Sequence, residues 1–449
     1  MTPPAMTPPG ASERVLEQLG HYESRNVTYV DPAGGWPIVW ERARGVHVWD
    51  AEGRKYLDLT AAFGVAAAGH ANPRVVAAGR AQMGRLLHAM GDVHPHARKA
   101  ELARELSALT LERWTEGRPA AERQTGKTIF CNSGFEAVEA ALKTALLATG
   151  RSQVIAFEQG YHGLGYGALN VTHREHFRGP FAAQLGGFAG FAPFPTTEAE
   201  LTATEGVLRR LFQEHSVGAV VVEPIQVRGG VRVPPPGFLP RLRELADEHG
   251  ALLVLDEIYT GFGRTGRWFA AEHAGVVPDL VCLGKALTGG FPLSACVGRA
   301  EVMDAAWPAA TGEAIHTSTY LGHPVGCAMA LAQLGEIQRA GLVARSAELG
   351  RELLDFLNAA VADLPGVRTV VRGLGLLAGV EVHGPDGAPA VRLVLDVVKD
   401  LLGAGHIVLP EGPNGNIIGF SPPLTITKTQ LAAAAAAMGR CLRARLSST

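Results

Sequence analysis

The chain has 449 residues, enough for roughly two or three domains, and its 41 Lys and Arg nearly balance its 43 Asp and Glu, for a net charge of −2. This balance excludes a polybasic nucleic-acid binder and a protein dominated by an acidic tail. No apolar run approaches the roughly 18 residues that span a bilayer, so we expect no membrane partner. Five scattered cysteines do not suit a disulfide framework and favour a reducing, cytoplasmic compartment.

The first segment, MTPPAMTPPG (1–10), lacks the basic and apolar stretches of a signal peptide. Its composition predicts a disordered lead-in, which we extend over residues 1–20. Short runs that are separated by turn residues follow and predict a small antiparallel sheet. These predicted strands span residues 38–41, 46–50 and 56–59.

From residue 72 to about residue 111 the apolar residues recur with helical spacing, which predicts a mostly helical stretch. Short apolar runs without polar alternation then follow, separated by longer amphipathic segments. This pattern is typical of strands buried on both faces that alternate with helices. It predicts an α/β fold with a mainly parallel central sheet flanked by helices. The predicted strands span residues 128–131, 154–157, 219–222, 251–255, 280–283 and 295–297.

The C-terminal part of the chain changes character. A long helix is predicted over residues 323–339, and a small mixed sheet is predicted further on. Its strands span residues 369–372, 375–382 and 417–420. We therefore predict a large domain and a smaller α+β domain that is built from both chain ends. The large domain spans residues 76–329, and the smaller one spans residues 21–75 and 330–449.

Three ionisable residues, Glu223, Asp256 and Lys285, directly follow predicted strands. Ligands of open α/β sheets bind beyond the carboxyl ends of the strands, so these side chains should share one site. A lone aspartate here often serves only as a cap, whereas a lysine is rare because its charge must leave the interior. Such a lysine can be a salt-bridge partner, a phosphate ligand or a Schiff-base former.

A predicted anion site follows the first strand of this sheet. The segment NSGFE (132–136) precedes a helical pattern, with Ser133 as N-cap and Glu136 at capping-box spacing. The free N–H groups of such a helix start bind anions, although the same residues also suit a plain capped helix. A phosphate site, a carboxylate and a lysine together point to pyridoxal phosphate (PLP), whose phosphate, ring nitrogen and aldehyde need these three groups.

With these residues in place, the sequence resembles the class III aminotransferases, a family of fold-type I PLP enzymes. The resemblance runs from about residue 34 to residue 427 and is specific because many motifs occur together. It implies a homodimeric, PLP-dependent aminotransferase. The motifs are WDAEGRKYLDL (49–59), GHANP (69–73), NSGFEAVEAALK (132–143), YHG (161–163), VEPIQ (222–226), LDEIYTGFGRTG (255–266), GKAL (284–287), STYLGHPVGCAMA (318–330) and PPLTIT (422–427).

The resemblance implies a role for each matching position. Lys285 resembles the Schiff-base lysine and Asp256 the partner of the pyridinium nitrogen, and these are the predicted catalytic residues. Thr319 resembles a threonine that reaches the phosphate of the neighbouring subunit, which implies shared active sites. The other predicted cofactor contacts are Ser133, Gly134 and the amide of Phe135 in the phosphate cup, Tyr161 and Ile258 on the two ring faces, Gln226 at the ring hydroxyl, and Glu223 at its strand end.

Three predicted substrate positions depart from the 4-aminobutyrate and ornithine aminotransferases of this family. Leu164 replaces their arginine for the ω-carboxylate, and Gly419 replaces their arginine for the α-carboxylate. Arg228 stands where they carry the glutamate that masks the second arginine. We therefore expect 4-aminobutyrate and ornithine to be poor substrates. Arg228 has two possible roles. It is either a relocated clamp for the substrate carboxylate, or a rim residue beside a site that takes amines or apolar amino acids.

The predicted reaction moves an amino group between an amine or amino acid and a 2-oxo acid. A racemase, an epimerase or an aminomutase on the same PLP scaffold stays open at this point. A nicotinamide dehydrogenase is a remote alternative, because GFGRTG (261–266) matches a dinucleotide motif. Four residues, 257–260, separate this motif from the strand end, and no clean helix follows it at once. The 16 histidines show no metal-ligand spacing, so no metal is predicted.

Overall fold

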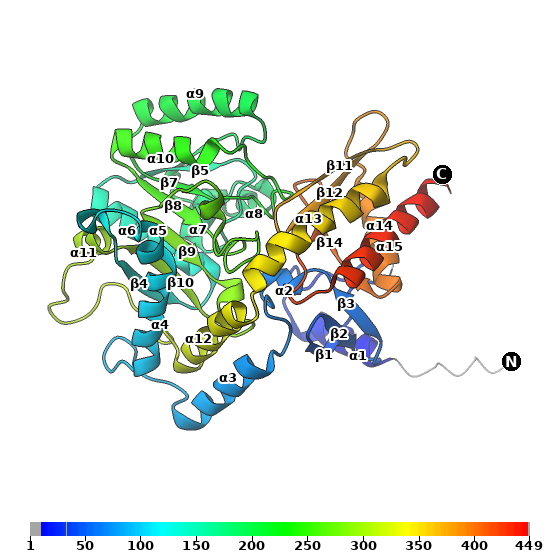
Figure 1. Ribbon diagram of the computed structural model, residues 1–449, viewed down its shortest axis with the longest axis horizontal. Helices are drawn as coiled ribbons and strands as arrows, with labels where there is room; N and C mark the ends of the chain where they lie inside the picture. The colour runs from blue at the N-terminus through cyan, green and yellow to red at the C-terminus, as the bar shows by residue number, and fades with distance from the viewer. Residues whose placement is uncertain (1–9, 33, 448–449) are drawn as a thin grey trace.

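The computed structural model describes residues 10–32 and 34–447. Figure 1 shows the central part of the chain, in cyan and green, in one body on the left. The first strands, in blue, and the last helices, in orange and red, lie together on the right. The two chain ends therefore build neighbouring structure although they are far apart in the sequence.

A helix, α1 (Ala11–Tyr22), occupies much of the segment that was predicted to be disordered. Residues 1–9 of that segment lie outside the described part of the chain. At the start of α1, the amide N–H and the hydroxyl of Ser12 donate to the carboxylate of Glu52 at 2.7 and 2.6 Å. The prediction was wrong for residues 11–20 because a carboxylate distant in the sequence binds the start of this helix.

A seven-stranded sheet with the order β4-β10-β9-β8-β7-β5-β6 forms the centre of the larger body. Strands β5 to β9 are parallel, and β10 is antiparallel to both of its neighbours. All strands except β10 therefore end at one edge of the sheet. The strands are β4 (Gly126–Cys131), β5 (Gln153–Phe157), β6 (Ala189–Ala192), β7 (Val217–Val222), β8 (Leu252–Asp256), β9 (Leu280–Leu283) and β10 (Ser294–Arg299).

This sheet confirms the predicted α/β fold with a mainly parallel centre, and every strand predicted for it is present. Alternate residues face opposite sides: Val254 of β8 packs in one apolar cluster with helix α6 (Gly134–Thr149). Its neighbours Leu253 and Leu255 pack in another cluster with α10 (Phe238–His249) and α9 (Glu198–Glu214). Burial on both faces explains the continuous apolar runs of the sequence. Strand β6 was not predicted, because its sequence AGFA has two alanines, a glycine and no β-branched residue.

The chain ends form two four-stranded sheets, with the orders β1-β2-β3-β13 and β11-β12-β15-β14. In the first, a strand from the C-terminal region runs parallel to β3 and so joins the two ends of the chain. Strands β13 and β14 were not predicted. The strands are β1 (Trp40–Arg44), β2 (His47–Asp50), β3 (Lys55–Asp58), β11 (Arg368–Gly373), β12 (Ala378–His383), β13 (His406–Ile407), β14 (Leu409–Glu411) and β15 (Ile417–Phe420).

The helices match the prediction less evenly. The helix predicted over residues 323–339 is α12 (Pro324–Arg339). The stretch predicted as helical from residue 72 to residue 111 is interrupted between Arg85 and Ala97, in a segment that contains Gly91 and Pro95. The remaining helices are α2 (Ala61–Gly64), α3 (Pro73–Arg85), α4 (Ala97–Ser107), α5 (Arg113–Thr115), α7 (Tyr166–Val171), α8 (Glu175–Arg178), α11 (Ala300–Ala306), α13 (Leu342–Val361), α14 (Val391–Gly403) and α15 (Lys428–Leu446).

The GFGRTG segment has a structural role between the two bodies. The buried guanidinium of Arg264 donates to the carbonyl oxygens of Leu376, at 2.9 Å, and Pro422. A Cβ at Gly266 would lie 2.8 Å from Cα of Ala347, and Gly266 has a φ of +86°, so a side chain is not tolerated there. Gly263 and Gly266 of this motif therefore serve close packing against the C-terminal region.

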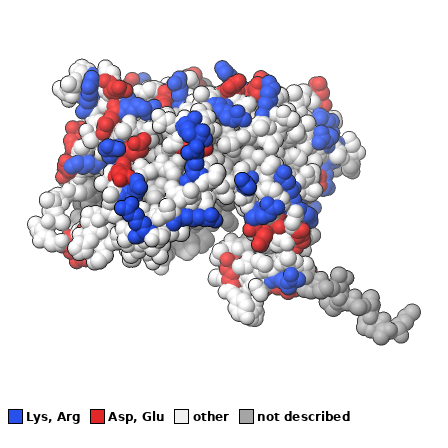
Figure 2. Space-filling view, turned by 60° about the horizontal axis from the view of Figure 1, so that its bottom comes forward, with Lys and Arg blue, Asp and Glu red and all other residues white. Residues whose placement is uncertain are grey.

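Charges of both signs are interspersed on the face of the molecule in Figure 2. This face shows no extended field of one sign, in keeping with the balanced composition. Of the helices in residues 10–32 and 34–447, none has the length and apolar character that crossing a membrane requires.

Candidate active site

The ends of β7, β8 and β9 lie next to one another at one edge of the large sheet. Glu223, Asp256 and Lys285, which end or follow these strands, line one pocket of about 330 Å³. The structure thus brings together the three ionisable residues singled out in the sequence. The other lining residues are Gly134, Phe135, Tyr161, His162, Gly163, Leu164, Arg228, Ile258 and Tyr259.

The Asp256 carboxylate is buried and held on both oxygens. Its Oδ1 accepts a hydrogen bond from the amide N–H of Ile258 at 3.0 Å, and its Oδ2 lies 2.8 Å from Nδ1 of His162. Burial alone would lower the pKa of His162, but the hydrogen bond to Asp256 and the charges of Asp256 and Glu223 raise it overall. His162 therefore serves as a hydrogen-bond donor, and it fixes the Asp256 carboxylate in one orientation.

Lys285 reaches the same pocket from the loop after β9. Its backbone has a φ of +40°, in the left-handed region that non-glycine residues seldom adopt. Its Nζ lies over the ring of Tyr259, 4.7 Å from the centroid. Burial lowers the pKa of Lys285, against the opposing charges of Asp256 and Glu223. A lowered pKa increases the fraction of neutral amine, which is the form that attacks carbonyls and accepts protons.

Glu223 braces the loops around the pocket. Its Oε1 accepts the amide N–H of Tyr161 at 2.9 Å, and its Oε2 accepts the amide N–H of Val227 at 3.3 Å. Burial raises the pKa of Glu223 to about 7, against the charge of His162 and these two hydrogen bonds. This carboxyl therefore orients both Tyr161, which lines the pocket, and the loop that carries Arg228.

The start of α6, which is predicted to bind the phosphate, lines the same pocket as Lys285. Glu136 accepts the N–H groups of Asn132, at 2.6 Å, and Ser133, at 3.0 Å, which is one half of a capping box. The Oγ of Ser133 is shielded from solvent and has no hydrogen-bond partner among the described residues. A Cβ at Gly134 would lie 3.0 Å from Cδ1 of Ile258, so a side chain at this position would press on Ile258.

Gln226 lies just behind the pocket. Its Nε2 donates to the carbonyl oxygen of Glu158 at 2.8 Å, and its buried Oε1 has no hydrogen-bond partner in the described part of the chain. An unpartnered hydroxyl at Ser133 and an unpartnered acceptor at Gln226 fit a ligand that has a phosphate and a hydroxyl group. The strand-end lysine and carboxylate add the amine and the ring-nitrogen partner, so the residues present fit PLP.

On the substrate side, Arg228 forms an ion pair that the sequence did not reveal. Its Nη1 lies 3.3 Å from Oε2 and 3.5 Å from Oε1 of Glu411, at the end of β14. Burial raises the pKa of Glu411, although the charges of Arg228 and Arg174 lower it. Gly419 does not line the pocket, and a Cβ there would lie 2.7 Å from Cγ of Glu411. The glycine thus leaves room for the Glu411 carboxylate.

Two other predicted residues lie further out. The side chain of Leu164 is at the mouth of the pocket, and the residue is 49% exposed. Thr319 is exposed, lies in the segment between α11 and α12, and does not line this pocket. Within a single chain, therefore, the structure does not bring Thr319 to the other site residues.

The sequence analysis missed His162, Tyr259 and Glu411. His162 stood in the YHG motif, and Tyr259 is three residues after Asp256, so both had a positional signal. The hydroxyl oxygen of Tyr259 lies 3.0 Å from Oγ of Ser421, and burial raises the pKa of this tyrosine to about 12. Glu411 had no signal, because only the pairing of β14 with β15 places it beside Arg228 and Gly419.

Comparisons with known proteins agree with this site. The profile of the family described as aminotransferase class-III matches residues 29–442. The acetylornithine aminotransferase of Methanosarcina mazei is 37% identical, over 89% of this chain and 90% of that protein. The 4-aminobutyrate aminotransferase of Escherichia coli is 36% identical, over 88% and 91%.

A solved amine transaminase from an uncultivated Pseudomonas species, in its PLP-bound form, has a TM-score of 0.83 and 29% identity, over 94% of this chain and 98% of that chain. The family match and these relatives settle the cofactor and the class of reaction that the pocket geometry indicated. The chain therefore belongs to the class III aminotransferases and is a PLP-dependent enzyme that moves an amino group between an amine or amino acid and a 2-oxo acid.

Proposed function

We propose that Lys285 and Asp256 are the catalytic residues and that PLP binds between the ends of β7, β8 and β9 and the start of α6. The observation that carries this proposal is the convergence of a lysine of lowered pKa, a fixed carboxylate and an unpartnered Ser133 hydroxyl around one pocket. When bound, PLP supplies an aldehyde that condenses with amines and a ring that withdraws electrons.

The chain's own groups then have separate tasks. The Nζ of Lys285, as a neutral amine, would take the proton from the reacting carbon of the substrate and deliver it to the cofactor carbon that derives from the aldehyde, rather than back to the substrate. Asp256, held by His162, keeps a negative charge where the ring nitrogen needs a proton. Ser133, Gly134 and the amide of Phe135 would bind the phosphate, while the Oε1 of Gln226 would accept a hydrogen bond from the ring hydroxyl.

The two faces of the ring are proposed to lie between Tyr161 and Ile258, which both line the pocket. Glu223 supports this arrangement indirectly, because it anchors the Tyr161 amide at 2.9 Å. These apolar and aromatic surfaces exclude water from the reacting carbon.

The transfer reaction is distinguished from racemisation and aminomutation by where the amino group ends. The relatives named above are aminotransferases, which favours transfer. Purified holoenzyme that is incubated with one amine and no 2-oxo acid should accumulate the aminated cofactor. The absorption spectrum of the enzyme measures this accumulation. An amino acid that is racemised or rearranged without such accumulation would contradict transfer.

We further propose that Arg228 is the carboxylate clamp for the substrate. Arg228 lines the pocket, and its recorded contact with Glu411 uses only Nη1, so the rest of the guanidinium can bind a carboxylate. Arg228→Ala should lower kcat/KM for an amino acid by about 10- to 100-fold, the loss of about 1.5–3 kcal/mol of charge-assisted hydrogen bonding. The matching amine without a carboxylate should be affected by less than about threefold.

This comparison also tests the alternative role of Arg228. An equal loss for the amino acid and the amine would make Arg228 a rim residue and leave the site to amines or apolar amino acids against Leu164. Arg209→Ala is the matched control, because Arg209 lies on α9 and pairs with Glu205 and Glu248 on the surface. The expectation that 4-aminobutyrate and ornithine are poor substrates stays a prediction and is measured in the same assay.

The enzyme is proposed to act as a homodimer with shared active sites. The segments 86–96 and 315–323 contact each other, since the His88 and Tyr320 rings lie 5.4 Å apart. Together they expose large apolar side chains, of which Ile315 is 76% and Tyr320 55% exposed. Apolar patches of this kind usually mark an interface, and here the proposed partner is a second copy of this chain.

Thr319 lies in this exposed region and is the proposed link to the partner's cofactor. Thr319→Val should weaken retention of PLP by about 1.5–3 kcal/mol, because a hydroxyl that donates to a phosphate is lost. Equilibrium dialysis measures the retention, and Thr311→Val, in the same exposed segment, is the control. A fully active monomer in sedimentation experiments would refute the shared site.

We also propose the two-domain division, with a large domain over 76–329 and a small domain from 21–75 and 330–449. The two four-stranded sheets built by the chain ends support this division. A cytoplasmic location is proposed from the free cysteines, of which Cys131, Cys282, Cys296 and Cys327 are buried.

A further inference from the structure

Tyr259 contacts the amine of Lys285 through its ring. The ring lines the active-site pocket, and the Nζ of Lys285 lies over it, 4.7 Å from the centroid. Tyr259 is only 9% exposed, so little water reaches this contact. A cation is attracted to the face of an aromatic ring, and the attraction is stronger where water is excluded. The ring therefore gives the Lys285 amine a defined position in the pocket.

The hydroxyl of Tyr259 is anchored on segments from both ends of the chain. Its oxygen lies 3.0 Å from Oγ of Ser421, and this Oγ donates to the carbonyl oxygen of Thr60 at 3.2 Å. Because a serine hydroxyl has one hydrogen, which Thr60 accepts, Tyr259 is the donor to Ser421. Burial raises the pKa of Tyr259, so its hydroxyl keeps the proton that this hydrogen bond needs.

A strained turn packs against the same ring. Residues 61–63, none of which is glycine, have φ of +47°, +49° and +60°, in the left-handed region. The carboxylate of Asp58 holds this turn, since its Oδ2 accepts the amide N–H of Ala62 at 3.1 Å. The turn brings Gly64 so close to Tyr259 that a Cβ would lie 2.9 Å from Cε1 of the ring. Strain of this kind persists only where the surrounding structure holds it, and here it fixes the ring from the side of the backbone.

Several charged groups face the Lys285 amine, but none of them binds it directly. Burial lowers the pKa of Lys285 and the like charge of Arg228 lowers it further, while the charges of Asp256, Glu223 and Glu411 raise it. Within residues 10–32 and 34–447, Nζ forms no ion pair and no hydrogen bond with these carboxylates. The position of Nζ in the pocket is therefore set by its contact with the aromatic ring.

We propose that Tyr259 is a positioning residue for Lys285, whose free amine is held by the face of the Tyr259 ring beside the reacting carbon. This inference rests on the proposed catalytic role of Lys285. The ring attracts the ammonium form, which arises when Lys285 has taken a proton from the substrate carbon. It thereby keeps the amine in place until the proton is delivered to the cofactor carbon, and it makes Lys285 a stronger base.

The test titrates Lys285 in the full-length enzyme from which PLP has been removed. Acetic anhydride labels neutral amines, so the labelling of Lys285 as a function of pH, measured by mass spectrometry of its peptide, gives the pKa of this amine. In Tyr259→Leu the midpoint should move to lower pH by about 0.5 to 1.5 units, because the ammonium loses its attraction to the ring. Tyr259→Phe keeps the ring and should keep the wild-type midpoint.

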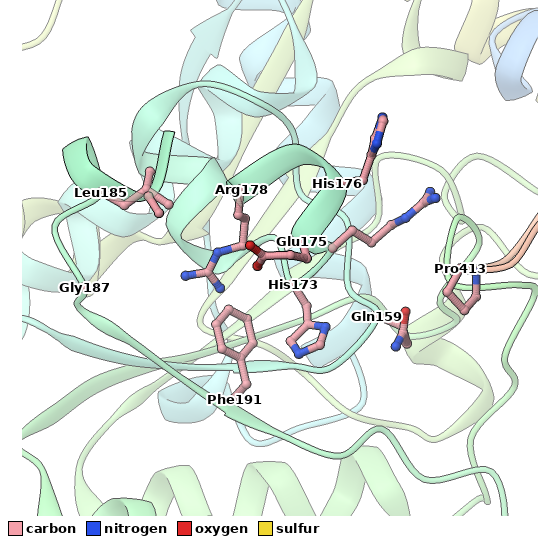
Figure 3. Close-up of a pocket in the computed structure, with 11 residues that line it drawn as sticks. Gln159, His173, Glu175, His176, Arg178, Leu185, Gly187, Phe191 and Pro413 are labelled. Carbon is pink, nitrogen blue, oxygen red and sulfur yellow. The ribbon is translucent and has the colours of Figure 1, made fainter. Parts of the chain in front are cut away.

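Phe191 provides a matched control. Figure 3 shows its ring and Arg178 in a second cavity, of about 620 Å³, which shares no lining residue with the active-site pocket. The Arg178 guanidinium lies 4.7 Å from the Phe191 centroid, the same distance as between Lys285 and Tyr259. Phe191→Leu thus removes an equivalent ring from beneath a different cation, and it should leave the Lys285 midpoint unchanged.

Turnover of the holoenzyme gives a second measurement. In Tyr259→Leu, kcat should fall by about tenfold or more while KM for the amine changes by less than about threefold, because proton transfer, unlike binding, needs the amine beside the reacting carbon. Tyr259→Phe should restore kcat to within about threefold of wild type. Tyr259→Met, which has no ring and fills irregular space well, replaces Tyr259→Leu if that variant does not fold.

The inference is overturned if the variants without a ring keep the wild-type midpoint or the wild-type kcat, or if Phe191→Leu shifts the midpoint equally. Lys285→Ala judges the proposed function separately. If Lys285→Ala is inactive and Tyr259→Leu behaves as wild type, Lys285 remains catalytic and only the positioning role of Tyr259 fails. If Lys285→Ala keeps its turnover, the proposed function fails, and the positioning role fails with it.

Discussion

Replacement of Lys285 by alanine should abolish turnover, by roughly 10⁴-fold or more, because the variant loses the amine that attacks carbonyls and moves the proton. Lys285 is the lysine that lines the described pocket, and no neighbouring side chain there supplies an amine. The visible absorption band that depends on attachment of the cofactor to Lys285 should disappear as well. Stopped-flow or steady-state transamination assays and the absorption spectrum measure the two effects.

The phosphate contacts proposed at the start of α6 do not involve Lys285, so we expect the variant to retain PLP without covalent attachment. Lys127→Ala is the matched control, since Lys127 is a surface lysine paired with Asp304. Substantial residual turnover in Lys285→Ala would sink the proposed mechanism.

Replacement of Asp256 by asparagine should reduce turnover by at least ~100-fold, or roughly 2.7 kcal/mol of barrier. The amide oxygen of asparagine can still accept the Ile258 N–H, which Asp256 binds at 3.0 Å, so the local shape is kept. The negative charge that favours a protonated ring nitrogen is lost. The kcat of the variant, measured at saturating amine and 2-oxo acid, gives the size of the effect.

The control for this variant is Asp247→Asn, because Asp247 is an exposed residue of α10 that pairs with Arg243. Turnover of Asp256→Asn within about threefold of wild type would show that another acid serves the ring nitrogen. In that case the contact between Nδ1 of His162 and Oδ2 of Asp256, at 2.8 Å, would not serve to hold a catalytic carboxylate.

The sequence predicted the large sheet well because a strand buried on both faces leaves a continuous apolar run that few other structures share. The residues at the ends of such strands could be assigned to one site, because parallel strands end at a common edge. Glu223, Asp256 and Lys285 do line one pocket for this reason.

The remaining elements depended on contacts between distant segments. At the start of helix α1, the amide N–H of Ser12 donates a hydrogen bond to Glu52. Neither residue alone predicts this contact from the sequence. Glu411 reaches Arg228 only because β14 pairs with β15, which short strands do not reveal. Local pattern therefore located the cofactor side of the site better than the substrate side, whose residues come from separate loops.

Redesign of the substrate preference of this enzyme cannot proceed one residue at a time. An arginine introduced at position 419 would place its Cβ 2.7 Å from Cγ of Glu411, so Gly419→Arg alone meets a steric conflict. A change of Glu411 alone removes the partner of Arg228 and leaves that cation unpaired. Positions 228, 411 and 419 thus form an epistatic unit, and we expect the effects of substitutions at these three positions to be non-additive.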